Sequence, residues 1–83
     1  MPKNVPSLKV KEMIRLLESA GCQFYRKGKG DHKLYMRYAG NRKVVVPIDT
    51  GAGELSPVYV LRILRQFQFS DEEIEALLSI YMG

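Results

Sequence analysis

Strand-like segments separated by glycine turns, between residues 22 and 47, constrain the fold of this chain more than any other feature. Three segments have the β-branched and aromatic residues of strands, and they are Cys22–Lys27, His32–Tyr38 and Lys43–Val46. The first turn, 28–31, contains two glycines, and the second, 39–42, contains a glycine–asparagine pair. Connections this short join antiparallel neighbours, so the pattern predicts a three-stranded antiparallel meander that Pro47 closes.

A helical pattern precedes the meander. Ser7 is a suitable cap for a helix that begins at Leu8 and ends near Gly21. Between these residues the apolar side chains follow helical spacing, at Val10, Met13, Ile14, Leu17 and Ala20. This stripe predicts a helix with one buried face.

Two further helices are expected after a loop that covers residues 48–55. Ser56 caps the first, which starts at Pro57 and is predicted to direct inward Val58, Leu61, Leu64 and Phe67. The run 70–73 is a capping box that opens a short helix, whose apolar face is Ile74, Leu77, Leu78 and Tyr81. Helices on one face of a three-stranded sheet give a two-layer α+β domain that leaves the other face open to a partner.

The second strand leaves one question open. Alternation puts one set of side chains on one face, namely His32, Leu34, Met36 and Tyr38, and the opposite set on the other, namely Lys33, Tyr35 and Arg37. The apolar Leu34 and Met36 are interpreted as the core side. Strict alternation would then turn His32 inward, but strand ends beside a turn often twist out of register.

Size and residue types exclude several classes of protein. The 83 residues are expected to form one domain, 1–83, with one modest core. No apolar run reaches the roughly 18 residues of a membrane span, and residues 1–6 lack the apolar stretch of a signal peptide, so a cytoplasmic protein is expected. With one cysteine and one histidine, we predict no disulfide, zinc site or cofactor, and a buried Cys22.

The positive charge lies in one half of the chain. Residues 1–45 contain eleven lysines and arginines and three acids, whereas residues 46–83 contain two and six. A basic half is typical of a surface that meets a polyanion, but it also fits a solvated surface that keeps a small protein soluble.

His32 is the candidate for chemistry, because no other side chain has an ordinary pKa near neutrality. Lys27, Lys29 and Lys33 surround it in sequence and can hold a phosphodiester, which the backbone N–H groups of a glycine turn approach closely at Gly30. RNA carries its own nucleophile, the 2′-hydroxyl, so a cleavage site needs a base, an acid and cations, and no metal. The second proton-transfer group stays open between water, Asp31, Tyr35 and a lysine.

The run Gly30-Asp31-His32-Lys33-Leu34-Tyr35 resembles the glycine, small or acidic residue, histidine motif of HicA toxins, the YcfA/HicA-like mRNA interferases. The similarity extends to the helix at 11–18 with its ending glycine, to Val46-Pro47 and to the later helices at 61–66 and 70–73. Many members carry a histidine soon after the valine–proline pair, where this chain has Ile48-Asp49, and a glycine–threonine pair where it has Pro57-Val58-Tyr59.

This resemblance implies a fold like the double-stranded RNA-binding domain, with a helix, three strands and a helix, here followed by a short C-terminal helix. It implies ribosome-independent mRNA cleavage by a toxin whose catalytic residue is His32. Its partner would be a HicB-like antitoxin that covers the site and represses the operon, so that DNA contact is indirect. The RNA-binding residues expected around His32 are Arg26, Lys27, Lys29, Gly30, Lys33, Arg37 and Lys43.

Two other functions are consistent with parts of the pattern. A non-catalytic RNA-binding module of the same fold would hold A-form RNA through its lysines and arginines, and the missing second histidine keeps this alternative open. A helix-turn-helix DNA-binding protein using residues 57–80 is disfavoured, because that half of the chain is net acidic.

Overall fold

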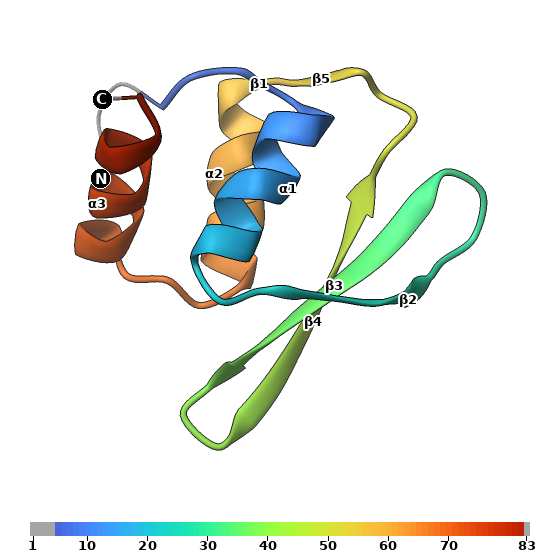
Figure 1. Ribbon diagram of the computed structural model, residues 1–83, viewed down its shortest axis with the longest axis horizontal. Helices are drawn as coiled ribbons and strands as arrows, with labels where there is room; N and C mark the ends of the chain where they lie inside the picture. The colour runs from blue at the N-terminus through green and yellow to red at the C-terminus, as the bar shows by residue number, and fades with distance from the viewer. Residues whose placement is uncertain (1–4, 83) are drawn as a thin grey trace.

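The computed structural model describes residues 5–82, which form helices and strands in the predicted order with one added pair of short strands (Figure 1). The elements are β1 (Leu8–Lys9), α1 (Val10–Ser19), β2 (Gln23–Lys27), β3 (His32–Ala39), β4 (Arg42–Asp49), β5 (Glu54–Leu55), α2 (Pro57–Gln66) and α3 (Asp71–Met82). No helix within this range has both the length and the apolar character needed to cross a membrane.

Strands β2, β3 and β4 form the predicted antiparallel meander, in that order across the sheet. Strand β4 is longer than predicted, because it continues through Pro47, which pairs with Leu34. As β4 lies at the edge of the sheet, a residue without an N–H is tolerated there. The expected α+β architecture, like that of the double-stranded RNA-binding domain, is confirmed.

The helices pack together on one side of the sheet, and the β3–β4 hairpin extends beyond them (Figure 1). Side chains from α1, α2, α3, β3 and β4 meet in one core, whose fully buried members include Met13, Leu17, Ile48, Ile63, Leu64, Phe67 and Ile74. Each large apolar side chain buried in this way contributes about 1.5–3 kcal/mol to the hydrophobic stabilisation of the fold.

The prediction of which face of β3 meets the core is wrong. Tyr35 is buried at 5% exposure, Leu34 and Met36 are only half-buried, and Tyr38 is 63% exposed. Because β3 has apolar residues at both alternate positions, its sequence does not distinguish the two faces; the decisive contacts are made in β4 by the buried Val46 and Ile48. We call the uncovered side the open face; it comprises His32, Leu34, Met36 and Tyr38 with their β4 partners Asp49, Pro47, Val45 and Lys43. On β2 it includes Arg26, which pairs with Leu34, and Tyr25, whose ring the Lys43 ammonium contacts.

The start of the first helix also differs from the prediction. Helix α1 begins at Val10, because Leu8 belongs to β1 and pairs with Leu55 of β5, and both leucines are buried. The expected loop 48–55 therefore ends in a strand. Ser7 does not cap the helix; the N-cap is Lys9, whose backbone N–H donates to the carboxylate of Glu12 at 2.9 Å.

Helix α2 has the predicted cap, but only half of its predicted inward residues are buried. The Ser56 hydroxyl accepts a hydrogen bond from the Tyr59 N–H at 3.3 Å, yet Val58, expected inward, is 69% exposed. Leu64 and Phe67 are buried as predicted, and Val60 and Ile63 complete a regular i, i+3, i+4, i+7 stripe in place of Val58 and Leu61. Leu61 is half-buried.

The capping box of α3 is confirmed. The Ser70 N–H donates to Glu73 at 2.8 Å, and the Glu73 N–H donates to the Ser70 hydroxyl at 3.1 Å. On the predicted apolar face Ile74 and Leu78 are buried and Leu77 is half-buried, while the side chain of Tyr81 lies outside the described side chains. Cys22 is buried, and burial raises the pKa of its thiol to about 11 against a smaller opposite effect of Arg37.

Candidate functional site

His32 is the first residue of β3 and its side chain is exposed. Since Tyr35 points into the core, alternation along the strand places His32 on the open face. The direction that the sequence left undecided is therefore outward. Its register partner across the sheet is Asp49.

The β2–β3 loop, residues 28–31, holds the imidazole through its backbone. The Gly28 N–H donates to the His32 carbonyl at 2.8 Å, and the His32 N–H donates to the Lys29 carbonyl at 3.1 Å. The imidazole Nδ1 lies 3.3 Å from the same Lys29 oxygen. A carbonyl only accepts hydrogen bonds, so this contact favours the tautomer with its proton on Nδ1 and leaves Nε2 as the basic nitrogen.

The turn 49–51 fixes this loop from the neighbouring strand end. The Thr50 N–H donates to the Asp31 carbonyl at 2.8 Å, and the Thr50 hydroxyl donates to the same oxygen. The Gly51 N–H donates to the Asp49 carboxylate at 3.0 Å. A Cβ on Gly51 would lie 2.5 Å from Asp31 Oδ2, so only glycine lets the two segments approach this closely.

Sequence reasoning missed Thr50 and Gly51. Their role depends on a contact between residues 19 apart in the chain, which no local pattern reports. Gly51 was predicted to lie in the loop 48–55, but it was interpreted as an ordinary loop residue.

Three of the predicted cations lie at the His32 end of the sheet. Lys27 and Lys33 are register partners on β2 and β3, and Lys29 stands in the loop between them. All three side chains are exposed. Gly30 has a φ of +59°, the left-handed conformation expected of a glycine in this turn. The end of the sheet that carries His32 thus also carries three exposed lysines, but alternation places Lys33, and Lys27 paired with it, on the face opposite the imidazole.

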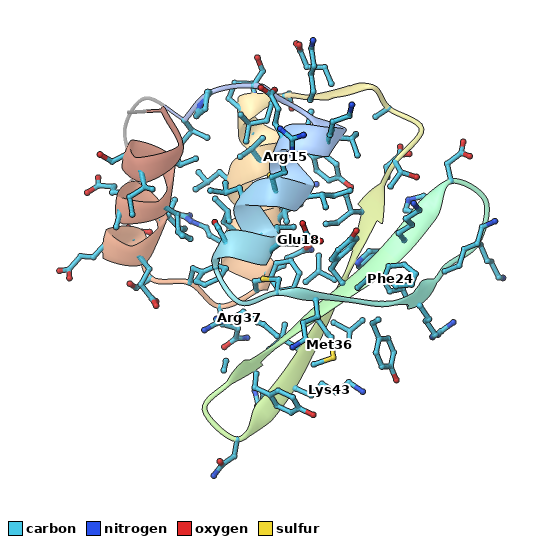
Figure 2. All side chains as sticks on the ribbon, viewed as in Figure 1. Arg15, Glu18, Phe24, Met36, Arg37 and Lys43 are labelled. Atoms are coloured by element: carbon cyan, nitrogen blue, oxygen red, sulfur yellow. The ribbon has the colours of Figure 1, made fainter. Side chains whose placement is uncertain are left out.

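Arg26 and Lys43 belong to the open face at greater distance from His32. Arg26 pairs with Leu34, and Lys43 pairs with Tyr38 at the far end of β3. Lys43 extends its ammonium nitrogen to 3.9 Å from the ring centroid of Tyr25 (Figure 2). Six residues of extended chain separate His32 from Tyr38, or about 20 Å.

Arg37 stands apart from the other predicted cations. Its side chain is on the core side of β3, where Nη1 donates to the Phe67 carbonyl at 2.6 Å and the guanidinium lies 4.1 Å from the Phe69 ring centroid (Figure 2). These contacts tie the sheet to the connection between α2 and α3. The structure thus gives Arg37 a packing role on the face opposite His32.

The two auxiliary candidates are also separated. Asp31 is exposed beside His32, whereas the ring of Tyr35 is buried on the core side, edge-to-face with Phe24 at 5.7 Å between centroids. Burial, and to a lesser degree the charge of Glu18, raises the pKa of Tyr35. Tyr35 is therefore not placed to exchange a proton with a group bound at His32.

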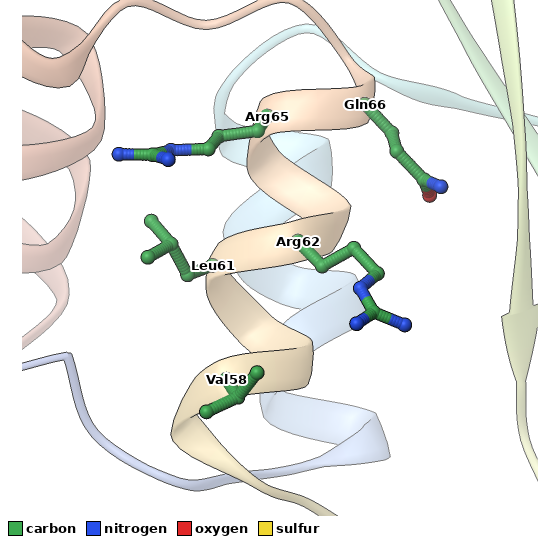
Figure 3. A pocket seen from close by; sticks show the side chains of 5 residues that line it. All are labelled: Val58, Leu61, Arg62, Arg65 and Gln66. Atoms are coloured by element: carbon green, nitrogen blue, oxygen red, sulfur yellow. The ribbon is translucent and has the colours of Figure 1, made fainter.

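A hollow elsewhere on the surface is lined by no histidine, cysteine or carboxylate. It measures about 390 Å³ on the outer side of α2 and is lined by Val58, Leu61, Arg62, Arg65 and Gln66 (Figure 3). Arg65 already forms an ion pair with Asp71 at 3.3 Å. Within residues 5–82, no three His, Cys, Asp or Glu side chains gather as a potential metal site.

Comparison with known proteins agrees with the site motif and the fold. Searches of the curated proteins and of the solved structures found no match. A scan against protein-family models matched residues 10–69 to the family described as the HicA toxin of bacterial toxin–antitoxin systems. The match runs from the first residue of α1 to Phe69 and includes the His32 loop and the turn 49–51. The chain therefore belongs to the HicA toxin family.

Proposed function

We propose that this toxin is an endoribonuclease that cleaves mRNA independently of the ribosome, with His32 as its catalytic residue. The observation that carries the proposal is the exposed imidazole on the open face, whose Nδ1 faces the Lys29 carbonyl while Nε2 is left as the basic nitrogen, at the end of the sheet that also carries the exposed Lys27, Lys29 and Lys33. Family membership as a toxin agrees with such an activity.

The chemistry follows from the groups at this end of the sheet. His32 Nε2 takes the proton of a ribose 2′-hydroxyl, whose oxygen then forms a bond to the adjacent phosphorus as the bond to the 5′-oxygen breaks. The products are a 2′,3′-cyclic phosphate and a 5′-hydroxyl. Lys29, in the loop beside His32, neutralises the charge that builds on the phosphate oxygens, and Lys27 and Lys33 add positive potential from the other face of the same strand ends. Water or a lysine protonates the leaving oxygen. No step uses a metal ion.

The partners proposed for this activity are mRNA and a HicB-like antitoxin. An antitoxin that covers His32 and the basic loop blocks both catalysis and RNA access. Contact with DNA is then made through the antitoxin in the complex, and the site of action is the cytoplasm.

The test is cleavage of RNA by purified wild-type protein and His32→Gln, in buffer with EDTA, together with growth after induced expression. Acid–base catalysis by one side chain is worth about 10²–10⁴-fold, so the variant should lose cleavage and toxicity. Since His32 is exposed, the free energy of unfolding of the His32→Gln variant should differ from that of the wild type by no more than about 0.5 kcal/mol. Arg62→Gln, which changes an exposed cation on α2, is the matched control and should cleave normally.

Cleavage retained by folded His32→Gln would refute the assignment of His32, and a strict magnesium requirement would refute the metal-independent mechanism. A second candidate function, RNA binding without cleavage, is favoured by one observation. The residue opposite His32 is Asp49, where the family resemblance implies a second histidine. If the wild type binds RNA without cutting it, and His32→Gln binds equally well, the protein is a non-catalytic RNA-binding module.

A further inference from the structure

The open face of the sheet is apolar and accessible at the same time. Tyr38 is 63% exposed, Tyr25 43% and Val45 39%, with the half-buried Leu34 and Met36 between them. On the other face, Tyr35, Val46 and Ile48 are buried in the core. A patch of this kind on a small protein marks a place where something binds.

The positive charges on the open face favour a polyanion as the bound molecule. Arg26 and Lys43 are exposed there, and Asp49 is the one acid among the β3–β4 pairs that compose the face. The Lys43 ammonium lies against the Tyr25 ring, and a hydrogen bond with this ammonium, together with its charge, lowers the pKa of the Tyr25 hydroxyl. Aromatic rings interleaved with cations are how sheet surfaces hold single-stranded nucleic acid.

The arrangement suits unpaired bases better than a duplex. Tyr25 and Tyr38 present ring faces on a sheet, and a base reaches such a ring only when it is splayed out of its own helix. In an A-form duplex the bases are stacked inside, and only phosphates and 2′-hydroxyls would meet this surface. The aromatic residues of the open face would then be left without a role.

The open face is continuous with the candidate catalytic site. His32 begins the same row of side chains that continues through Leu34 and Met36 to Tyr38, over about 20 Å. A strand bound along this row has one of its phosphates at His32. The β2 bulge at Tyr25 brings an additional ring to the middle of the path.

We propose that the open face binds single-stranded RNA, with bases stacked on Tyr25 and Tyr38 and phosphates paired with Arg26 and Lys43, and presents the strand to His32. The last part rests on the proposed ribonuclease activity; the binding itself does not. The sheet is then the surface that selects unpaired RNA, although the fold resembles that of double-stranded RNA-binding domains.

The test measures binding apart from cleavage. In the His32→Ala background, fluorescence anisotropy follows a labelled, unstructured RNA of about 12 nucleotides, alone or annealed to its complement. Tyr25→Leu and Tyr38→Leu should each weaken single-strand binding about tenfold, and the double variant more than either. Phe24→Leu is the matched control, because this exposed phenylalanine neighbours Tyr25 on β2 but packs against Tyr35 on the other face.

Equal binding of the single strand by wild type and both tyrosine variants, with duplex bound as tightly, would overturn the proposal. So would a dimer in size-exclusion chromatography that dissociates on Tyr38→Leu, since the face would then join two copies. In the His32-containing protein, the tyrosine variants should raise KM for long RNA and leave kcat unchanged. If the wild type cuts no RNA but the tyrosine variants lose binding, the ribonuclease proposal fails and the binding face stands. If the tyrosine variants bind RNA normally and the wild type cuts RNA in a His32-dependent way, the binding face fails and the ribonuclease proposal stands.

Discussion

Arg37→Met should lower the free energy of unfolding by about 2–3.5 kcal/mol. The substitution keeps an unbranched apolar stem but removes the guanidinium that donates to the Phe67 carbonyl at 2.6 Å and lies over the Phe69 ring. A hydrogen bond from a charged donor contributes about 1.5–3 kcal/mol, and a cation–π contact in a partly buried position about 0.5–2 kcal/mol. Because Arg37 is only half-buried, solvent screening makes the lower half of the combined range the better expectation.

The backbone at this contact adds to the effect. Gln68, between the two phenylalanines, has a φ of +70°, a conformation that costs a non-glycine residue about 1 kcal/mol or more. Arg37 holds the carbonyl immediately before this residue. Its loss therefore removes one of the contacts that keep the α2–α3 connection in a strained conformation.

Urea unfolding followed by circular dichroism measures the change. With a slope of about 1 kcal/mol per molar urea for a domain of this size, the midpoint should fall by about 2 M or more while the slope is unchanged. The control is Arg42→Met, an exposed cation at the tip of the same hairpin, which should cost less than about 0.5 kcal/mol. Equal midpoints for the two variants, with a loss of RNA binding in Arg37→Met, would refute the packing role and restore Arg37 as an RNA contact.

Two further outcomes follow from the loop and the last helix. Gly51→Ala should lower RNA cleavage at least tenfold with little change in unfolding midpoint, because the added carbon would lie 2.5 Å from Asp31 Oδ2 and displace the loop that positions the imidazole; undiminished cleavage would refute this role. Ser70→Ala should cost about 1 kcal/mol in urea unfolding at pH 7, whereas Ser79→Ala on the exposed side of α3 should be neutral. The backbone N–H of Ser70, and then its hydroxyl, lower the pKa of Glu73, so their contribution is present above pH 4.5 and is lost as pH falls through the lowered pKa; an unchanged acid limb in Glu73→Gln would contradict it.

Features encoded by neighbouring residues were predicted well. The meander follows from glycine turns and β-branched segments, and the caps at Ser56 and Ser70 follow from side chains three residues from their backbone partners. His32 became the candidate catalytic residue because a single residue type carries the required pKa and its flanking residues carry the charge. These inferences needed no knowledge of the tertiary contacts between distant residues.

Features that depend on distant partners were not predictable. Leu8 was predicted to begin the first helix, but it lies in β1, where it forms a buried pair with Leu55. Arg37 looked like one more member of a basic strand, and its partner, the Phe67 carbonyl, is 30 residues away. The contact of Thr50 with Asp31 is of the same kind. In each case tertiary packing decided between conformations or roles that the local sequence allowed equally.

The misassigned face of β3 has a different cause, and it bears on function. Leu34 and Met36 were interpreted as core because they are as apolar as core residues, yet the structure places them beside the exposed Tyr38 with no helix of residues 5–82 over them. A solvated sheet face normally alternates to polar side chains, so apolar residues here have a cost in solubility that folding alone does not explain. Local rules are expected to fail where a surface is kept for binding. The error therefore coincides with the one face that also carries His32, and it is a reason, independent of the histidine motif, to locate the functional surface there.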